Sequence, residues 1–175
     1  MEAGRLGMGL VQQALPGAQV QPWPGLEMAE PELRLTPNDQ RIIEAGDRGM
    51  YVSVMLFNGW STDYPKGSYE LANPWIGHPY NAANNINRLG DVPRTDVYTL
   101  DKSGGLLAVQ EAMTRKLVTE LRGFDNLFYE ICNEPYFGGV TLPWQYRIAD
   151  TIIDVEAELP NKHLISRNVA NGQAE

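Results

Sequence analysis

The chain has 175 residues, 43% of them hydrophobic and 21% charged, which is typical of a protein that folds around one buried core. Its net charge of −8 disfavours nucleic acid or an anionic membrane as a partner, and no stretch reaches the ~18 consecutive apolar residues of a membrane span. The single cysteine, Cys132, excludes an internal disulfide, and the acidic start is a poor signal peptide, so the compartment stays open.

The beginning of the chain differs in composition from the rest. Residues 1–35 are rich in Gly, Pro and Gln and follow no regular period, so we assign them no structure and take residues 36–175 as the folded domain. Order is expected to begin at Thr36 and Pro37, which form a helix-start signal, and a short helix is predicted over 37–47.

A strand, a long irregular segment and a second helix follow. The apolar run 50–57 predicts a strand buried on both faces, as in a parallel sheet. Residues 58–105 show little periodicity, and a loop of that length inside a compact domain is either functional or a sign that its elements are wrongly assigned. A helix is then expected, with Glu111 and Arg115 able to pair on its outer face. Its apolar stripe consists of Leu106, Val109, Met113, Leu117 and Leu121.

The last third of the chain repeats the alternation. Residues 126–132 read as a second buried strand, in which Cys132 is predicted to be an inert buried thiol. A third strand is expected near 163–167, after a helix whose outer face carries Asp150, Asp154 and Glu158. The inner stripe of that helix consists of Trp144, Ile148, Ile152, Val155 and Leu159.

Alternating helices and strands predict an α/β fold with a parallel sheet. The pattern alone fits both a doubly wound sheet and a barrel. No GxGxxG or GxxxxGK[ST] loop stands at a strand–helix junction, and this favours a barrel whose strand ends carry the site.

Polar residues follow the second buried strand directly, as Asn133 and Glu134 before Pro135. In parallel α/β enzymes this edge of the sheet holds the active groups, and a carboxyl there can protonate a departing sugar oxygen. The plainer interpretation is a solvated glutamate in a turn. Glu130 lies four residues earlier, about 13 Å along an extended strand, so it is too distant to be the catalytic partner and a structural role is expected.

Residues 126–135, NLFYEICNEP, resemble the fourth strand and acid/base motif of the clan of (β/α)8 retaining glycoside hydrolases that contains the family 5 cellulases. GMYVSVMLFNGWS is similar to the third strand and its loop, HPYNAANNIN to the long active-site loop, and WQYRIADTIIDVEAELP to the fourth helix. The similarity covers residues 36–170. It implies a partial TIM barrel that holds about strands 3 to 5 with their helices and the long active-site loop.

The resemblance implies that Glu134 is the general acid/base and that Asn133 binds the sugar 2-hydroxyl. It also suggests residues that line the substrate cleft, namely Trp60, His78, Asn81 and Asn85. For two of these a structural role stays open: packing of the loop for Trp60, and hydrogen bonding for His78. Turn chemistry is the better interpretation of Asn84, and packing that of Trp75.

In this family the nucleophile is a glutamate at the end of the seventh strand. We therefore expect it outside residues 1–175, and expect the chain to be a piece of a barrel with an open, apolar edge. Two alternatives remain: a carbohydrate-binding module that does not hydrolyse, and a truncated, inactive barrel. His78 and His163 lie far apart, so neither a metal nor a cofactor is predicted. The expected partner is a carbohydrate, and the oligomeric state stays open.

Overall fold

The computed structural model describes residues 37–62, 73–135 and 139–169. The segment 1–35, Thr36 and the last six residues lie outside the described part. The order of elements confirms the predicted alternation of helices and strands, with ends displaced by a few residues. The elements are α2 (Pro37–Gly46), β1 (Val52–Asn58), η1 (Trp60–Thr62), η2 (Pro74–Gly77), α3 (Leu106–Leu121), β2 (Leu127–Asn133), α4 (Leu142–Glu156) and β3 (Leu164–Ser166).

The three strands form one parallel sheet in the order β1-β2-β3. The pairing of β1 with β2 runs from Val52 opposite Leu127 to Asn58 opposite Asn133. Four consecutive residues of β1, 54–57, are buried, as expected for a strand covered on both faces. The predicted α/β class and its parallel sheet are therefore confirmed.

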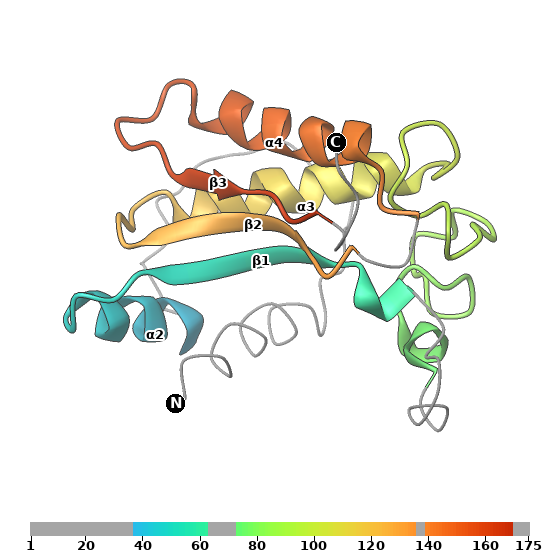
Figure 1. The fold of residues 1–175 in the computed structure, drawn as a ribbon, viewed down its shortest axis with the longest axis horizontal. Helices are drawn as coiled ribbons and strands as arrows, with labels where there is room; N and C mark the ends of the chain where they lie inside the picture. Colours follow the sequence, from blue (N-terminus) through green and yellow to red (C-terminus); the bar gives the residue numbers. More distant parts are fainter. Residues whose placement is uncertain (1–36, 63–72, 136–138, 170–175) are drawn as a thin grey trace, which may run out of the picture.

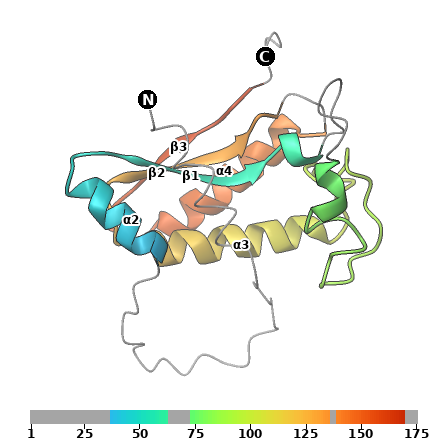
Figure 2. The same cartoon turned by 90° about the horizontal axis from the view of Figure 1, so that it is seen from below.

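The described helices form a single layer on one face of the sheet. Figure 2 shows α2, α3 and α4 on the same side of the three strands. In Figure 1 the long loop segments between β1 and α3 lie beyond the end of the sheet at which β1 stops. None of the described helices is long and apolar enough to cross a bilayer.

The buried face of α3 differs from the predicted stripe. The residues that face the interior are Leu106, Gln110, Thr114, Val118 and Leu121, whereas Val109, Met113 and Leu117 are only partly buried. The face is displaced by one residue because Gln110 finds two buried partners. Its Nε2 donates to the Val97 carbonyl at 2.8 Å, and its Oε1 accepts from the Trp144 indole at 2.8 Å.

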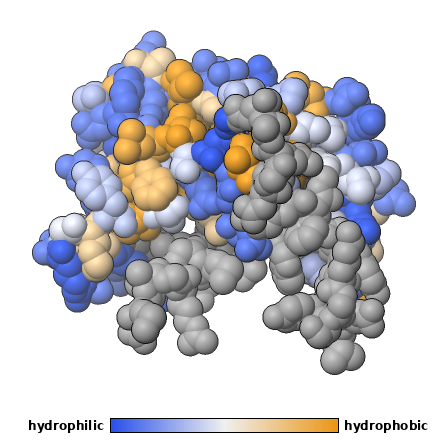
Figure 3. Space-filling view, in the orientation of Figure 1, coloured by the Kyte–Doolittle hydropathy of each residue, from blue (hydrophilic) through white to orange (hydrophobic). Residues whose placement is uncertain are grey.

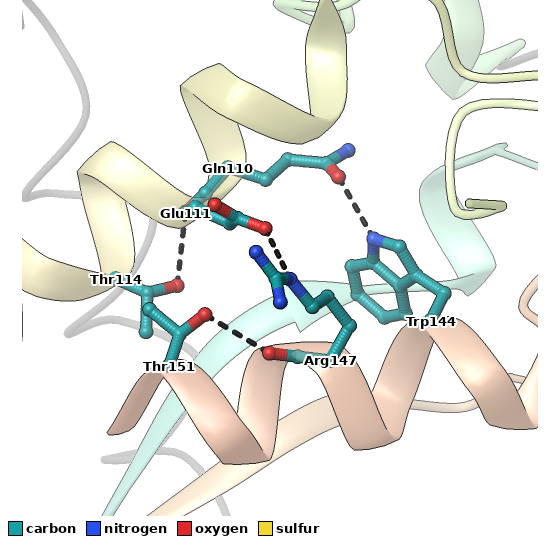
Figure 4. Close-up of polar contacts among 6 residues, drawn as sticks. All are labelled: Gln110, Glu111, Thr114, Trp144, Arg147 and Thr151. Atoms are coloured by element: carbon teal, nitrogen blue, oxygen red, sulfur yellow. Dashed lines mark hydrogen bonds and ion pairs between the residues drawn. The ribbon is translucent and has the colours of Figure 1, made fainter. Parts of the chain in front are cut away.

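The contact between α3 and α4 also changes the predicted ion pair. Glu111 is bonded not to Arg115 but to Arg147 of α4, at 2.6 Å (Figure 4). On α4, Trp144, Ile148 and Ile152 are fully buried, and Asp150 and Asp154 are exposed, as the sequence predicted. The helix ends at Glu156, so the exposed Glu158 and the partly buried Leu159, both predicted to belong to it, lie beyond its end.

A buried polar cluster of His163, Glu156 and the Phe124 carbonyl lies at the end of the sheet where β2 and β3 begin. His163, which precedes β3, lies between Glu156 at the end of α4 and Phe124 before β2. Its Nδ1 is 2.5 Å from a Glu156 oxygen and its Nε2 is 2.5 Å from the Phe124 carbonyl. Each ring nitrogen therefore lies within hydrogen-bond distance of an oxygen, and the ring joins the end of α4 to the segment before β2.

Cys132 is fully buried, and burial raises the pKa of its thiol far above its usual range. A thiol that stays protonated is a poor nucleophile. The prediction that Cys132 is buried is confirmed, and its lack of reactivity stays a prediction.

Candidate functional site

The candidate site lies where β1 and β2 end, at the carboxyl edge of the sheet. Asn58 and Asn133 are the last paired residues of these strands. The contact continues one step further, because the Gly59 N–H donates to the Asn133 carbonyl at 2.7 Å. Glu134 thus directly follows the last residue of β2, and its carbonyl group lies close to Gly59.

Glu134 has a backbone conformation that side-chain-bearing residues rarely adopt. Its φ is 47°, in the left-handed region, and the residue is partly exposed, while the next residue, Pro135, is buried. Non-glycine residues in this region are strained and gather at functional sites, where the surrounding structure holds them. The chain therefore turns sharply at Glu134 directly after the strand.

The loop that follows β1 is tied to the segment that follows β2. Tyr98 and Val140 form an isolated parallel bridge, and the Thr141 N–H donates to the Tyr98 carbonyl at 3.1 Å. The Tyr98 hydroxyl also lies 3.4 Å from the Asn58 carbonyl, to which it donates. Residues that come from two loops of the chain thus meet at the edge that carries Glu134.

An aromatic cluster fills the space beneath these loops. The ring of Tyr98 lies 4.7 Å from Trp144, 5.8 Å from Phe57 and 6.1 Å from Tyr80, measured between centroids. The contacts with Phe57 and Tyr80 are edge-to-face, and such contacts add to the stabilisation from burial. The loop is anchored to the core of the sheet and helix layers by these rings.

His78 has the surroundings of a structural residue. It is buried, its ring stacks on Trp75 at 5.1 Å, and its Nδ1 accepts the Tyr80 N–H at 3.1 Å. Burial lowers the pKa of His78 to about 4, so the ring is neutral near pH 7. The hydrogen-bonding role that the sequence left open is present, and a role in binding substrate stays a prediction.

Three asparagines of the same loop, Asn81, Asn84 and Asn85, form hydrogen bonds with its backbone. Asn84 donates to the Ile76 and His78 carbonyls, which confirms its predicted turn role. Asn81 donates to the Trp75 carbonyl and accepts the Ala83 N–H, and Asn85 accepts the Asn87 N–H. Contact of Asn81 or Asn85 with a sugar stays a prediction.

The two tryptophans of the loop belong to two short helices, η1 and η2, that contact each other. Trp60 is the first residue of η1, directly after Gly59, and η1 contacts η2. Trp75, in η2, is partly buried against the core, which confirms its predicted packing role. Whether Trp60 forms a sugar platform stays a prediction.

Glu130 lies on the sheet face opposite α4. Its neighbour Tyr129 faces His163 at 5.3 Å, and successive strand residues point to opposite faces. The Ser53 hydroxyl donates to a Glu130 oxygen at 3.5 Å. This contact fits the structural role expected for Glu130.

Gly59 was not among the residues predicted from the sequence, because its closeness to Glu134 depends on the pairing of two strands that are distant in the chain. The available signal was a glycine directly after a strand, which often marks a close approach of another backbone.

Among the described residues, no group of three His, Cys, Asp or Glu side chains could hold a metal ion. Comparison of the chain with models of known families, with curated proteins and with solved structures finds no match.

Proposed function

We propose that this chain carries the acid/base part of a retaining glycoside hydrolase whose catalytic layer is a (β/α)8 barrel. The arrangement of the described elements supports this. Strands that are neighbours in sequence are neighbours in the sheet, all of them are parallel, and the described helices lie on one face. A section of barrel wall would have this arrangement, with helices outside and the opposite sheet face pointing to the barrel interior.

The character of the sheet face opposite the helices also supports the barrel. Phe128 and Leu164 are paired in register, so they share a face, and strand alternation places Phe128 on the side opposite Tyr129. Leu164 is 77% exposed. Figure 3 views the molecule from this side, and apolar side chains gather there over the strands. An apolar sheet face needs a covering layer, and the remaining strands of a barrel would supply one.

The observation that carries the proposal is the position of Glu134. It follows a parallel strand at the carboxyl edge, has φ of 47°, and stands between Asn133 and Pro135. Enzymes of this architecture place their catalytic groups at this edge. A strained, partly exposed carboxylate there is more readily explained by function than by stability, since a glycine would relieve the strain.

In the proposed reaction Glu134 gives its proton to the glycosidic oxygen as the bond from that oxygen to the anomeric carbon breaks. A second carboxylate, expected outside residues 1–175, forms the new bond to the anomeric carbon from the opposite face. The Glu134 carboxylate then takes a proton from water as that water attacks the anomeric carbon and releases the second carboxylate. Asn133 is proposed to bond the sugar 2-hydroxyl. Neither a metal nor a cofactor takes part.

The test compares Glu134→Gln with Glu130→Gln in the full-length protein. The substrates are aryl β-glycosides of cellobiose, mannobiose and xylobiose, each with a good leaving group, 2,4-dinitrophenol, and a poor one, phenol. Glu134→Gln should lose activity selectively on the phenyl glycosides, by about 100-fold or more, because only the poor leaving group needs a proton. Glu130→Gln, on the same strand, should keep the wild-type ratio. Equal rates of Glu134→Gln and wild type on phenyl glycosides would contradict the proposal, and binding without turnover by the wild-type protein would favour a carbohydrate-binding module.

A further inference from the structure

We infer that Gly59 is a positioning residue for the Glu134 carboxyl, acting through the backbone of the loop after β2. The inference rests on the proposed function of Glu134. Gly59 follows β1 directly and belongs to a different strand–loop unit from Glu134. Its contact with Glu134 joins the ends of the two strands that form the candidate site.

Gly59 stands where a side chain has no room. A Cβ added to it would lie 2.7 Å from the Glu134 carbonyl oxygen, 2.9 Å from the Pro135 Cα and 3.2 Å from the Glu134 carbonyl carbon. All three are backbone atoms, which cannot rotate away as the end of a long side chain can. The absence of a Cβ therefore allows the backbone of Glu134 to lie directly against the end of β1.

Gly59 is itself fixed on both sides. Its N–H donates to the Asn133 carbonyl at 2.7 Å. Its carbonyl accepts from Thr62 twice, at 3.1 Å from the backbone N–H and 2.8 Å from the hydroxyl, and Thr62 is buried. The steric clash of a side chain at position 59 would therefore be relieved chiefly by movement of Glu134 and Pro135.

Glu134 is the residue at which such a movement has the largest effect. Its φ of 47° is held by its surroundings rather than preferred by the residue, so loss of the Gly59 contact allows the backbone to relax. A rotation of that backbone swings the carboxyl away from the position required for proton transfer. A misplacement of about 1 Å at a reacting group can lower the rate about 100-fold.

Gly59→Ala tests the inference, with Gly77→Ala as its matched control. Gly77 also lies in the loop after β1, at the end of η2, but a Cβ added there would meet no atom within 4 Å and its φ is not in the left-handed region. The readout is the ratio of kcat/KM on dinitrophenyl and phenyl β-glycosides of the disaccharide that the wild-type protein hydrolyses fastest. Gly59→Ala should lose about 10- to 100-fold on the phenyl glycoside and much less on the dinitrophenyl glycoside. Gly77→Ala should keep both rates.

A general weakening of the fold would lower both rates of Gly59→Ala equally, and that result would overturn the inference, as would behaviour identical to Gly77→Ala. The proposed function is tested separately by Glu134→Gln. A selective loss in Glu134→Gln without one in Gly59→Ala overturns only the role of Gly59, whereas no selective loss in Glu134→Gln overturns the proposed function itself.

The wild-type protein gives a measurement that does not depend on the folding of a variant. The Gly59 amide proton should exchange with solvent at least about tenfold more slowly than in an unstructured peptide, because it is bonded to Asn133. Exchange at the unstructured rate would show that β1 and β2 do not meet at Gly59, and it would overturn the inference.

Discussion

The indole N–H of Trp144 donates a hydrogen bond to the side-chain oxygen of Gln110 at 2.8 Å, and neither residue is exposed to solvent (Figure 4). The same amide donates to the Val97 carbonyl through its nitrogen. One glutamine thus joins α3, α4 and the loop that precedes α3. It links the helix layer to the loops that meet at the candidate site.

Replacement of this glutamine should destabilise the fold. In Gln110→Leu the Trp144 N–H and the Val97 carbonyl would each lose a buried partner, and an unsatisfied buried group costs about 1–3 kcal/mol. We expect the free energy of unfolding, measured by urea denaturation, to fall by about 2–4 kcal/mol. Lys116→Gln, an exposed change on the same helix, should leave the denaturation midpoint nearly unchanged. Equal midpoints for the two variants would show that the Gln110 bonds contribute little.

A second prediction concerns the buried pair of Glu156 and His163, whose side chains are 3% and 2% exposed. Glu156→Gln replaces the carboxyl group that contacts the His163 ring and accepts the His163 backbone N–H, and loss of a buried hydrogen-bond partner typically costs about 1–3 kcal/mol. The change should therefore lower the unfolding free energy by about that amount. Glu111→Gln, which breaks the more exposed pair with Arg147, should have a clearly smaller effect in the same urea titration. If Glu156→Gln lowered the free energy of unfolding no more than Glu111→Gln does, the contact between Glu156 and His163 would not stabilise the fold as expected.

The low pKa of His78 predicts a dependence of stability on pH. Its pKa is about 4 in the folded protein because of burial, against 6.5 in the unfolded chain. Between these values the unfolded chain binds more protons, so stability is full above pH 6.5 and falls as the pH decreases towards 4. The His78 contribution to this fall, from pH 7 to pH 4.5, should be about 2 kcal/mol.

His78→Asn isolates that contribution. Asparagine does not titrate, and its side-chain oxygen can accept the Tyr80 N–H as the histidine Nδ1 does. Urea denaturation of both proteins at pH 7 and pH 4.5 should show a smaller fall in stability for the variant. The same fall in both would mean that His78 is accessible to protons in the folded state.

Much of the fold followed from the period of its apolar residues. The helix predicted from the apolar stripe of Leu106 to Leu121 is present as α3, and the apolar runs before Asn58 and Asn133 form the paired strands. The buried face of α3 could not be predicted, because a pattern of apolar residues places Gln110 outside. Its partners, Trp144 and Val97, are distant in sequence, and only the folded chain brings them to it.

The candidate site was predictable in position but not in conformation. A strand followed by Asn133 and Glu134 indicates the carboxyl edge of a parallel sheet from sequence alone. The left-handed backbone of Glu134 is not encoded by its own residue type, which disfavours it. The residue in contact with that backbone, Gly59, lies 75 positions earlier in the chain, so the pattern around Glu134 does not reveal the contact.

The most direct test of the account is chemical rescue of Glu134→Ala in the full-length protein. The variant should still form a glycosyl-enzyme from a dinitrophenyl β-glycoside, and added azide should attack it to give the β-glycosyl azide, because azide needs no help from a general base. The expected result is a rate that rises with azide and a product azide of retained configuration, with no such product from the wild-type protein. Hydrolysis of phenyl glycosides at the wild-type rate, without any glycosyl azide, would contradict the assignment of Glu134.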